Sequence, residues 1–319
     1  MDIRRVLPKD SIQSIDEPTF SADRNVDAEE QVLVIEPEDG PARAYPKLIL
    51  NYHEIVNDSV DDTPIAITWC PLCGSAVVYE RSVDGEVLTF GVSGKLADDD
   101  LVMYDRESES EWKQSTGACI DGPFTGVSLE IRPAGMMPFE RFAKAHPDGL
   151  VLERPDGPHP VVIPAEDGGE LTTETTEIDY SVDHFAEYVE SDWLGSRSRE
   201  SARAWNRTDI AAKEIVLGIE VDDGAIGIPQ SRVAAVERVS VGDVAVVVFD
   251  VDGELHAFEA PGFTFEQTAT GTYLGDGTEW DGATGQAADG RALDRIPARR
   301  LFAFAWQADH GPDAFYLGT

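Results

Sequence analysis

The chain repeats one series of short sequence patterns, and this repetition is the feature that most restricts how it can fold. Residues 32–36 (Val-Leu-Val-Ile-Glu) match residues 216–220 (Val-Leu-Gly-Ile-Glu), and an Asp-Gly pair and a proline follow each stretch. Later matches keep the same order: Glu111-Trp112 and Thr116-Gly117 with Glu279-Trp280 and Thr284-Gly285, Leu129 and Pro133 with Leu293 and Pro297, and His146 and Asp148 with His310 and Asp313. An ordered series predicts two diverged copies of one structural unit.

The duplication divides the chain, whose 319 residues also suggest two domains. We expect a lead-in segment at residues 1–31, a first repeat at 32–154, a linker at 155–213 and a second, degenerate repeat at 214–319. The linker begins with turn-forming prolines and glycines, and its later part predicts a helix at about residues 198–206.

Strand patterns fill both copies. Residues 64–69 and 244–249 are short apolar runs rich in β-forming residues. Asp-Gly pairs between such runs are strong hairpin signals, and they occur at Asp39-Gly40, Asp84-Gly85, Asp223-Gly224 and Asp252-Gly253. Pro46 is expected to begin a short helix through Leu50. The predicted fold class is mainly β, with α+β as the fallback: two tandem barrel-like or sandwich-like units with few short helices.

Reactive residues occur in the first copy only, whereas the scaffold positions match in both. Residues 52–58 (Tyr-His-Glu-Ile-Val-Asn-Asp) correspond to Ala-Val-Glu-Arg-Val-Ser at 235–240. Residues 69–74 (Trp-Cys-Pro-Leu-Cys-Gly) correspond to Val-Phe-Asp-Val-Asp-Gly at 248–253, a plain hairpin sequence. This asymmetry indicates that the function lies in the first copy.

Cys70 and Cys73 form the sharpest motif, Cys-Pro-Leu-Cys-Gly. Two thiolates at this spacing can bind one soft metal ion, and Gly74 permits the tight turn beneath the sulfur atoms. A redox dithiol is a second interpretation, although such motifs usually precede a helix and residues 75–79 here predict a strand. The third interpretation is purely structural, with two small apolar cysteines filling a turn.

Other residues could complete a metal site or a catalytic site together with this motif. His53 and Cys119 are the obvious additions, and three protein ligands plus water would form a catalytic metal site. Glu54, next to His53, and Asp105 and Arg106 are the candidate catalytic residues, although an ion pair of Asp105 and Arg106 that orders the loop before Trp112 is also expected. The triplet at residues 98–100 (Asp-Asp-Asp) is interpreted as a solvated turn, since its spacing is not that of a calcium loop.

The charge of the chain restricts its partners. Acidic residues outnumber basic ones 61 to 25, the formal net charge is −36, and the acidic residues are spread along the whole chain. Such a surface repels itself until salt screens it, at roughly 1 M, where the Debye length is about 3 Å. We infer a salt-rich cytosol, as in halophilic archaea. The same charge argues against binding to nucleic acid or to anionic membranes, so a small molecule or a protein remains as the partner.

A cytoplasmic location is expected from two further features. No apolar segment follows Arg4 and Arg5, and no stretch approaches 18 consecutive apolar residues. Three cysteines are too few for a disulfide framework, which agrees with a reducing compartment.

Five motifs together resemble the family of domains of unknown function numbered 3179 (DUF3179). They are residues 42–46 (Ala-Arg-Ala-Tyr-Pro), 53–58 (His-Glu-Ile-Val-Asn-Asp), 70–76 (Cys-Pro-Leu-Cys-Gly-Ser-Ala), 90–96 (Phe-Gly-Val-Ser-Gly-Lys-Leu) and 101–106 (Leu-Val-Met-Tyr-Asp-Arg). The resemblance covers nearly the whole chain and implies no established activity. Many relatives look secreted or lipid-anchored, and this chain lacks their leader. Cys119 stands where the family pattern has a small or acidic residue, which leaves His53, Cys70 and Cys73 as the expected metal ligands.

The leading hypothesis is therefore a site in the first copy that depends on zinc, another soft metal or a thiol, with Asp105 and Arg106 supporting the ligands. An open coordination position would permit Lewis-acid or hydrolytic chemistry. The alternative is a non-catalytic module that binds a ligand or a protein in a groove between the copies, with the cysteines in a structural turn. The sequence favours no single reaction and does not decide whether the protein is an enzyme.

The acidic composition generates a first prediction. Lowering the KCl concentration from roughly 2 M to roughly 0.1 M should reduce the free energy of unfolding, because the Debye length grows and the acidic surface groups repel one another. Chemical denaturation at both salt concentrations measures the difference. Equal stability in both would contradict adaptation to salt.

Overall fold

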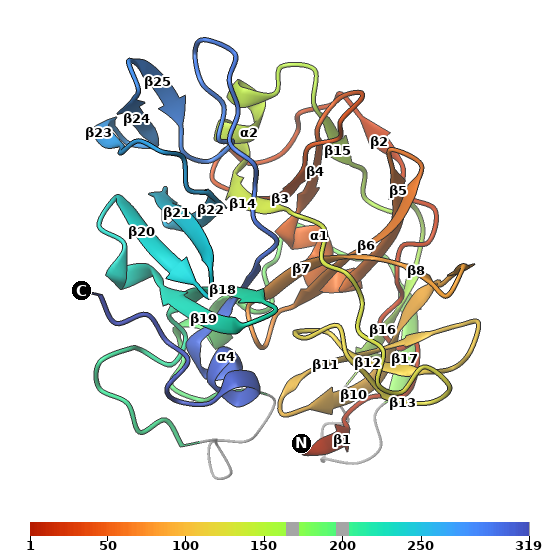
Figure 1. Cartoon of the computed structure of the whole chain (residues 1–319). Helices are drawn as coiled ribbons and strands as arrows, with labels where there is room; N and C mark the ends of the chain where they lie inside the picture. The colour runs from red at the N-terminus through yellow and green to blue at the C-terminus, as the bar shows by residue number, and fades with distance from the viewer. Residues whose placement is uncertain (164–171, 196–203, 319) are drawn as a thin grey trace.

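The structure is a computed structural model that describes residues 1–163, 172–195 and 204–318. Within this part of the chain most secondary structure is β, and the helices are short (Figure 1). The predicted mainly β class is thus confirmed. The helix predicted at residues 198–206 falls mostly within residues 196–203, which lie outside the described residues.

A six-stranded antiparallel sheet lies at the centre and draws strands from both halves of the chain. Its strand order is β19 (Gly224–Pro229), β18 (Ile215–Val221), β26 (Arg299–Phe302), β7 (Ser75–Glu80), β6 (Thr63–Cys70) and β5 (Ile55–Val60). The two predicted repeats therefore share a sheet, and they meet where β26 pairs with β7.

Two five-stranded sheets are built from the first half. One has the order β1 (Ile3–Arg5), β10 (Phe90–Ala97), β11 (Asp100–Asp105), β12 (Glu111–Lys113) and β13 (Cys119–Asp121). The other has the order β14 (Gly135–Pro138), β3 (Gln31–Ile35), β4 (Arg43–Pro46), β15 (Leu150–Leu152) and β2 (Phe20–Ser21), with β15 parallel to β4.

Smaller sheets complete the described structure. They are β20 (Val236–Val241), β21 (Val244–Val251) and β22 (Glu254–Glu259); β23 (Glu266–Ala269), β24 (Thr272–Gly275) and β25 (Thr278–Asp281); β8 (Ser82–Val83) with β9 (Glu86–Val87); and β16 (His159–Ile163) with β17 (Thr172–Thr176). The described helices are α1 (Lys47–His53), α2 (Phe139–Ala145), α3 (Ala186–Glu190), α4 (Ala303–His310) and the 3₁₀ turn η2 (Gln230–Arg232).

The predictions of hairpins and of a helix start are confirmed. The four Asp-Gly pairs lie at the turns of antiparallel hairpins: β3 with β4, β8 with β9, β18 with β19, and β21 with β22. In the third hairpin the turn is Asp222-Asp223, and Gly224 already pairs with Val221. Pro46 is the residue before α1, where its fixed φ suits a helix start. The helix runs to His53, slightly beyond the expected end.

Matching contacts recur in the two halves. Gly117 and Gly285 both have positive φ, and a Cβ on either would meet an aromatic ring, of Tyr79 in the first half and of Phe258 in the second. Each glycine carbonyl also accepts the N–H of a leucine, Leu129 or Leu293. These pairs support the tandem duplication, which stays a prediction.

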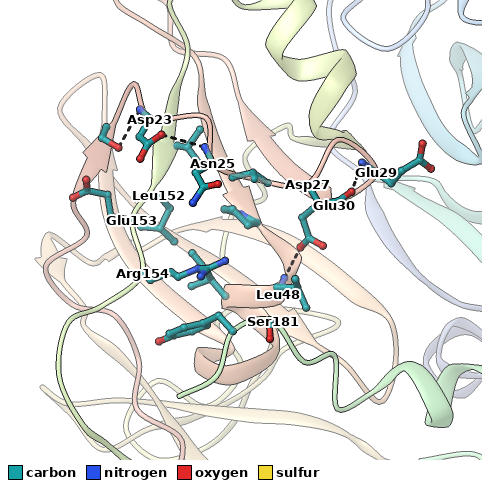
Figure 2. Close-up of a pocket in the computed structure, with 16 residues that line it drawn as sticks. Asp23, Asn25, Asp27, Glu29, Glu30, Leu48, Leu152, Glu153, Arg154 and Ser181 are labelled. Carbon is teal, nitrogen blue, oxygen red and sulfur yellow. Dashed lines mark hydrogen bonds between the residues drawn. The ribbon is translucent and has the colours of Figure 1, made fainter. Parts of the chain in front are cut away.

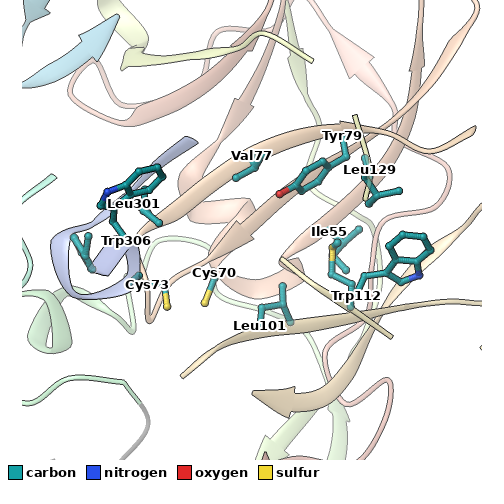
Figure 3. Packing of buried hydrophobic residues seen from close by; sticks show 14 of the residues in the cluster. Ile55, Cys70, Cys73, Val77, Tyr79, Leu101, Trp112, Leu129, Leu301 and Trp306 are labelled. Atoms are coloured by element: carbon teal, nitrogen blue, oxygen red, sulfur yellow. The ribbon is translucent and has the colours of Figure 1, made fainter. Parts of the chain in front are cut away.

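Strands from the two halves of the chain lie side by side. β26 of the second half lies beside β7 of the first, and β14 of the first half lies beside β22 of the second (Figure 1). One hydrophobic core cluster accordingly contains side chains from both halves, among them Cys70, Trp112, Leu301 and Trp306 (Figure 3). The first half is therefore packed against the second rather than folded apart from it.

Gly74 couples the cysteine turn to the second half, which gives a second prediction. Its φ is +56°, and a Cβ there would lie 2.7–2.9 Å from three ring carbons of Phe302. Gly74→Ala should lower the free energy of unfolding by roughly 3 kcal/mol, from left-handed strain together with overpacking. Chemical denaturation in high salt measures this loss.

Gly253 provides the matched control for this prediction. It occupies the corresponding hairpin with φ +84°, and the nearest atom to an added Cβ is 3.8 Å away. Gly253→Ala should therefore cost only about 1 kcal/mol. Equal losses of unfolding free energy in the two variants would show that the contact with Phe302 does not add to the cost of Gly74→Ala.

Candidate functional site

The Cys-Pro-Leu-Cys turn joins β6 to β7 and holds both of its sulfur atoms in the protein interior. The strands pair down to Cys70 opposite Ser75, so Cys73 lies in the tight connection between them. Cys70 is 1% exposed and Cys73 is fully buried. Figure 3 shows the two sulfur atoms on the same side of the turn. The geometry fits one ion held between two sulfur atoms.

Asp100 joins these two cysteines from the neighbouring sheet. One carboxylate oxygen of Asp100 and the two sulfur atoms all lie within 4.8 Å of one another. Asp98 and Asp99 form the expected turn, but Asp99 is 1% exposed and Asp100, which begins β11, is 2% exposed, so the turn is not solvated as we expected. Among the described residues this is the single group of three or more His, Cys, Asp or Glu side chains that could hold a metal.

The Asp100 carboxylate has one oxygen in use and one without a partner. Oδ2 accepts the backbone N–H of Ser115 at 2.7 Å. Oδ1 is buried and has no hydrogen-bond partner. Leaving a buried polar atom unpaired costs roughly 1–3 kcal/mol, and more for a charged group. A bound ion or an ordered water molecule would give this oxygen a partner.

The thiols are poor nucleophiles in this environment. Burial raises the pKa of the Cys70 thiol. The hydrogen bond between the two thiols, followed by burial, raises the pKa of Cys73 well above its ordinary value. Burial also raises the pKa of Asp100, to about 6. Since reactive cysteines need depressed pKa values, and a strand rather than a helix follows the motif, the redox interpretation loses support.

Glu54 is a further buried acidic residue, at the end of α1. It follows the last residue of α1 with φ +57°, it is 8% exposed, and its Oε2 has no hydrogen-bond partner. Burial, and then the charge of Asp100, raises the pKa of Glu54 to about 8. Glu54 was considered as a catalytic residue from the sequence; it is not part of the group formed by Cys70, Cys73 and Asp100.

His53 is held elsewhere. Its Nδ1 lies 2.7 Å from the carbonyl oxygen of Gln13, so this nitrogen donates, and its Nε2 accepts the hydroxyl of Tyr180 at 2.6 Å. Burial lowers the pKa of His53 to about 4. Because both ring nitrogens have partners in the lead-in segment and the linker, the structure does not bring His53 to Cys70 and Cys73. Asp100 takes the place that we expected for it.

Asp105, Arg106 and Cys119 also lie outside the group. The Asp105 carboxylate is fully buried and accepts the Trp112 indole N–H at 2.9 Å, and Ser108 donates to both of its oxygens. Arg106 contacts Asp16 at 3.2 Å. The Cys119 thiol donates to the carbonyl of Asp121 at 3.3 Å. Asp105 therefore orders the loop before Trp112 through Ser108 and the Trp112 indole, and not through the expected ion pair with Arg106, which pairs with Asp16 instead.

The second half supports the site through α4. Asp309 in this helix forms an ion pair with Lys113. Its Oδ2 also accepts the hydroxyl of Ser115 at 2.7 Å, and the N–H of Ser115 in turn donates to Asp100. The chain from Asp309 to Asp100 fixes the position of the Asp100 carboxylate. Nothing in the spacing of Asp100 or Asp309 along the sequence indicates these contacts.

A surface pocket lies apart from the cysteines. It has a volume of about 660 Å³ and is formed by the lead-in segment, the start of α1, the end of β15 and the linker (Figure 2). Leu152 and Ile49 contribute apolar surface, and Glu30 and Arg154 contribute charge. Cys70, Cys73 and Asp100 do not line it.

A family model matches nearly the whole chain. The family described as "Protein of unknown function (DUF3179)" matches residues 9–313. No curated protein and no solved structure matches the chain.

The neutral state of His53 generates a third prediction. The pKa is about 4 in the folded protein and about 6.5 when unfolded, so the unfolded chain binds more protons between these values. Stability should therefore fall as the pH is lowered from 6.5 to 4, by roughly 3 kcal/mol from this group. His53→Gln removes this share, so the variant should lose less stability across that window. Denaturation curves in high salt at each pH measure both slopes, and parallel profiles would contradict the assignment.

Proposed function

From the premise that this chain belongs to the DUF3179 family of proteins of unknown function, we propose that it binds a borderline or soft divalent metal ion, such as Zn²⁺. The ligands are Cys70, Cys73 and Asp100. The observation that carries this proposal is the convergence of two buried sulfur atoms and a carboxylate whose Oδ1 has no partner.

The spacing of the donor atoms suits such an ion. Zinc binds thiolate sulfur at about 2.3 Å and carboxylate oxygen at about 2.0–2.2 Å, so tetrahedral ligands lie roughly 3.5–4 Å apart. The three donor atoms lie within 4.8 Å of one another, which leaves only small movements for binding. The ion would replace the thiol protons and supply the missing partner of Asp100.

The burial of the donors favours a structural or regulatory metal over a hydrolytic centre. All three donor residues are at most 2% exposed. A hydrolytic site would need an open position that a substrate can reach. An ion at this position would join the turn between β6 and β7 to the start of β11, and so stabilise the junction of two sheets.

A second candidate function is the binding of a small molecule in the pocket of about 660 Å³. Its apolar residues and converging charged groups are typical of ligand pockets. The groove expected from the sequence lay between the copies, whereas this pocket belongs to the first half and the linker. The metal site does not depend on this pocket.

The setting of the protein is also part of the proposal. All three cysteines are free, and the charge of −36 suits a salt-rich cytosol and disfavours nucleic acid and anionic membranes as partners. Within the described residues, no helix combines the length and the apolar character needed to cross a membrane.

The fourth prediction tests metal binding directly. Protein purified in high salt without chelator should contain close to one equivalent of metal, and elemental analysis measures this content. The double variant Cys70→Ser/Cys73→Ser should lose the metal, because both sulfur ligands are gone.

Two variants serve as matched controls. Cys119→Ser removes a thiol outside the group, and His53→Gln removes the imidazole that we first expected to bind. Both should keep the metal content of the wild type. Absence of metal from the wild type, or its retention in the double variant, would overturn the proposal.

A further inference from the structure

Arg154 lines the surface pocket of about 660 Å³, and among the described arginines it alone forms neither a hydrogen bond nor an ion pair. Its guanidinium carbon lies 5.6 Å from the centre of the Tyr180 ring. In a chain with 61 acidic and 25 basic residues, an arginine without a carboxylate partner is unusual. Arg154 is exposed, so an anionic group of a ligand can reach it and form the paired hydrogen bonds that guanidinium makes with carboxylates.

The same pocket also carries an excess of negative charge. The carboxylate side chains that line it are Asp23, Asp27, Glu29, Glu30 and Glu153. Within the described part of the chain, none of them forms an ion pair with Arg154 or with any other residue. The pocket therefore holds groups of opposite charge apart from one another. A cationic group of a ligand would compensate the excess of negative charge.

Glu30 is the carboxylate best fixed for such a contact. It is partly buried, whereas the other four acidic residues are exposed. Its Oε1 accepts the backbone N–H of Leu48 at 2.7 Å, which holds the carboxylate at the start of α1. Burial raises the pKa of Glu30. A cation in contact with this carboxylate would stabilise its charged form.

Apolar side chains complete the pocket. Leu48 and Ile49 come from α1, and Leu152 comes from the end of β15. In the view of Figure 2, Leu48 lies between Arg154 and Glu30. The volume of about 660 Å³ is within the range of small-molecule pockets, roughly 300–1,000 Å³. Such a lining suits a ligand that combines an aliphatic part with one positive and one negative group.

We propose that this pocket binds a small zwitterion of the amino acid type with an aliphatic side chain. Arg154 binds its carboxylate, and Glu30 binds its ammonium group. The inference rests on the second candidate function, the binding of a small molecule in this pocket. A purely anionic ligand would be repelled by the five carboxylates, and a simple amine would leave Arg154 without a partner. A zwitterion satisfies both charges.

The test compares three compounds of similar shape by isothermal titration calorimetry in high salt. L-leucine carries both charges, 4-methylpentanoate lacks the ammonium group, and 3-methylbutylamine lacks the carboxylate. Leucine should bind the wild type at least about tenfold more tightly than either analogue, because each analogue loses one charge-assisted interaction.

Variants assign each charge to its residue. Arg154→Gln should weaken binding of leucine by about tenfold and leave that of 3-methylbutylamine unchanged, because this compound has no carboxylate. Glu30→Gln should weaken binding of leucine to a similar extent and leave that of 4-methylpentanoate unchanged. Arg238→Gln is the matched control, since Arg238 is exposed and lies outside the pocket. It should keep the wild-type affinity for leucine, and circular dichroism checks that each variant is folded.

The failures of the candidate function and of this inference are distinguishable. A wild type that binds none of the three compounds overturns both. A wild type that binds either analogue as tightly as leucine retains a ligand pocket but overturns the preference for a zwitterion. Unchanged leucine affinity in Arg154→Gln or Glu30→Gln, or an equal loss in Arg238→Gln, overturns the contacts assigned to these residues.

Discussion

The pairing of β26 with β7 is the interaction on which the rest of the molecule depends. Arg300 lies opposite Ala76, and the N–H of Phe302 donates to the carbonyl of Cys73 at 2.8 Å. Arg300 also donates to the carbonyl of Gly74 at 2.6 Å and pairs with Glu254. The cysteine turn is therefore fastened by main-chain and guanidinium hydrogen bonds from the half of the chain that carries no reactive residues.

The second half of the chain contributes to the geometry of the cysteine turn. Its β26 holds the turn that positions the sulfur atoms, and its α4 supplies Asp309, which acts through Ser115 on Asp100. A half of the chain that has no cysteines can therefore still be required for the geometry of the half that carries them.

The sequence predicted the turns and the helix start, which depend only on neighbouring residues. Asp-Gly pairs specify their own turns, and Pro46 specifies the start of α1. Asp100 was missed because its neighbours Asp98 and Asp99 make it look like part of a solvated turn, and its burial depends on contacts with Ser115 and the cysteine strands. His53 was expected at the thiols because it was an obvious further ligand for the cysteine motif, but at the end of α1 its ring bonds Gln13 and Tyr180 instead. Pairing between strands that are distant in sequence determines where such side chains lie, and no local sequence motif specifies that pairing.

The order of synthesis gives the shared sheet a further consequence. Cys73 emerges from the ribosome long before Phe302, the residue whose N–H closes the cysteine turn. Since contacts between distant parts of a chain form late and slowly, the cysteine turn remains without this contact until Phe302 has been made. A chain that stops before Phe302 would carry the cysteines without the strand that holds their turn.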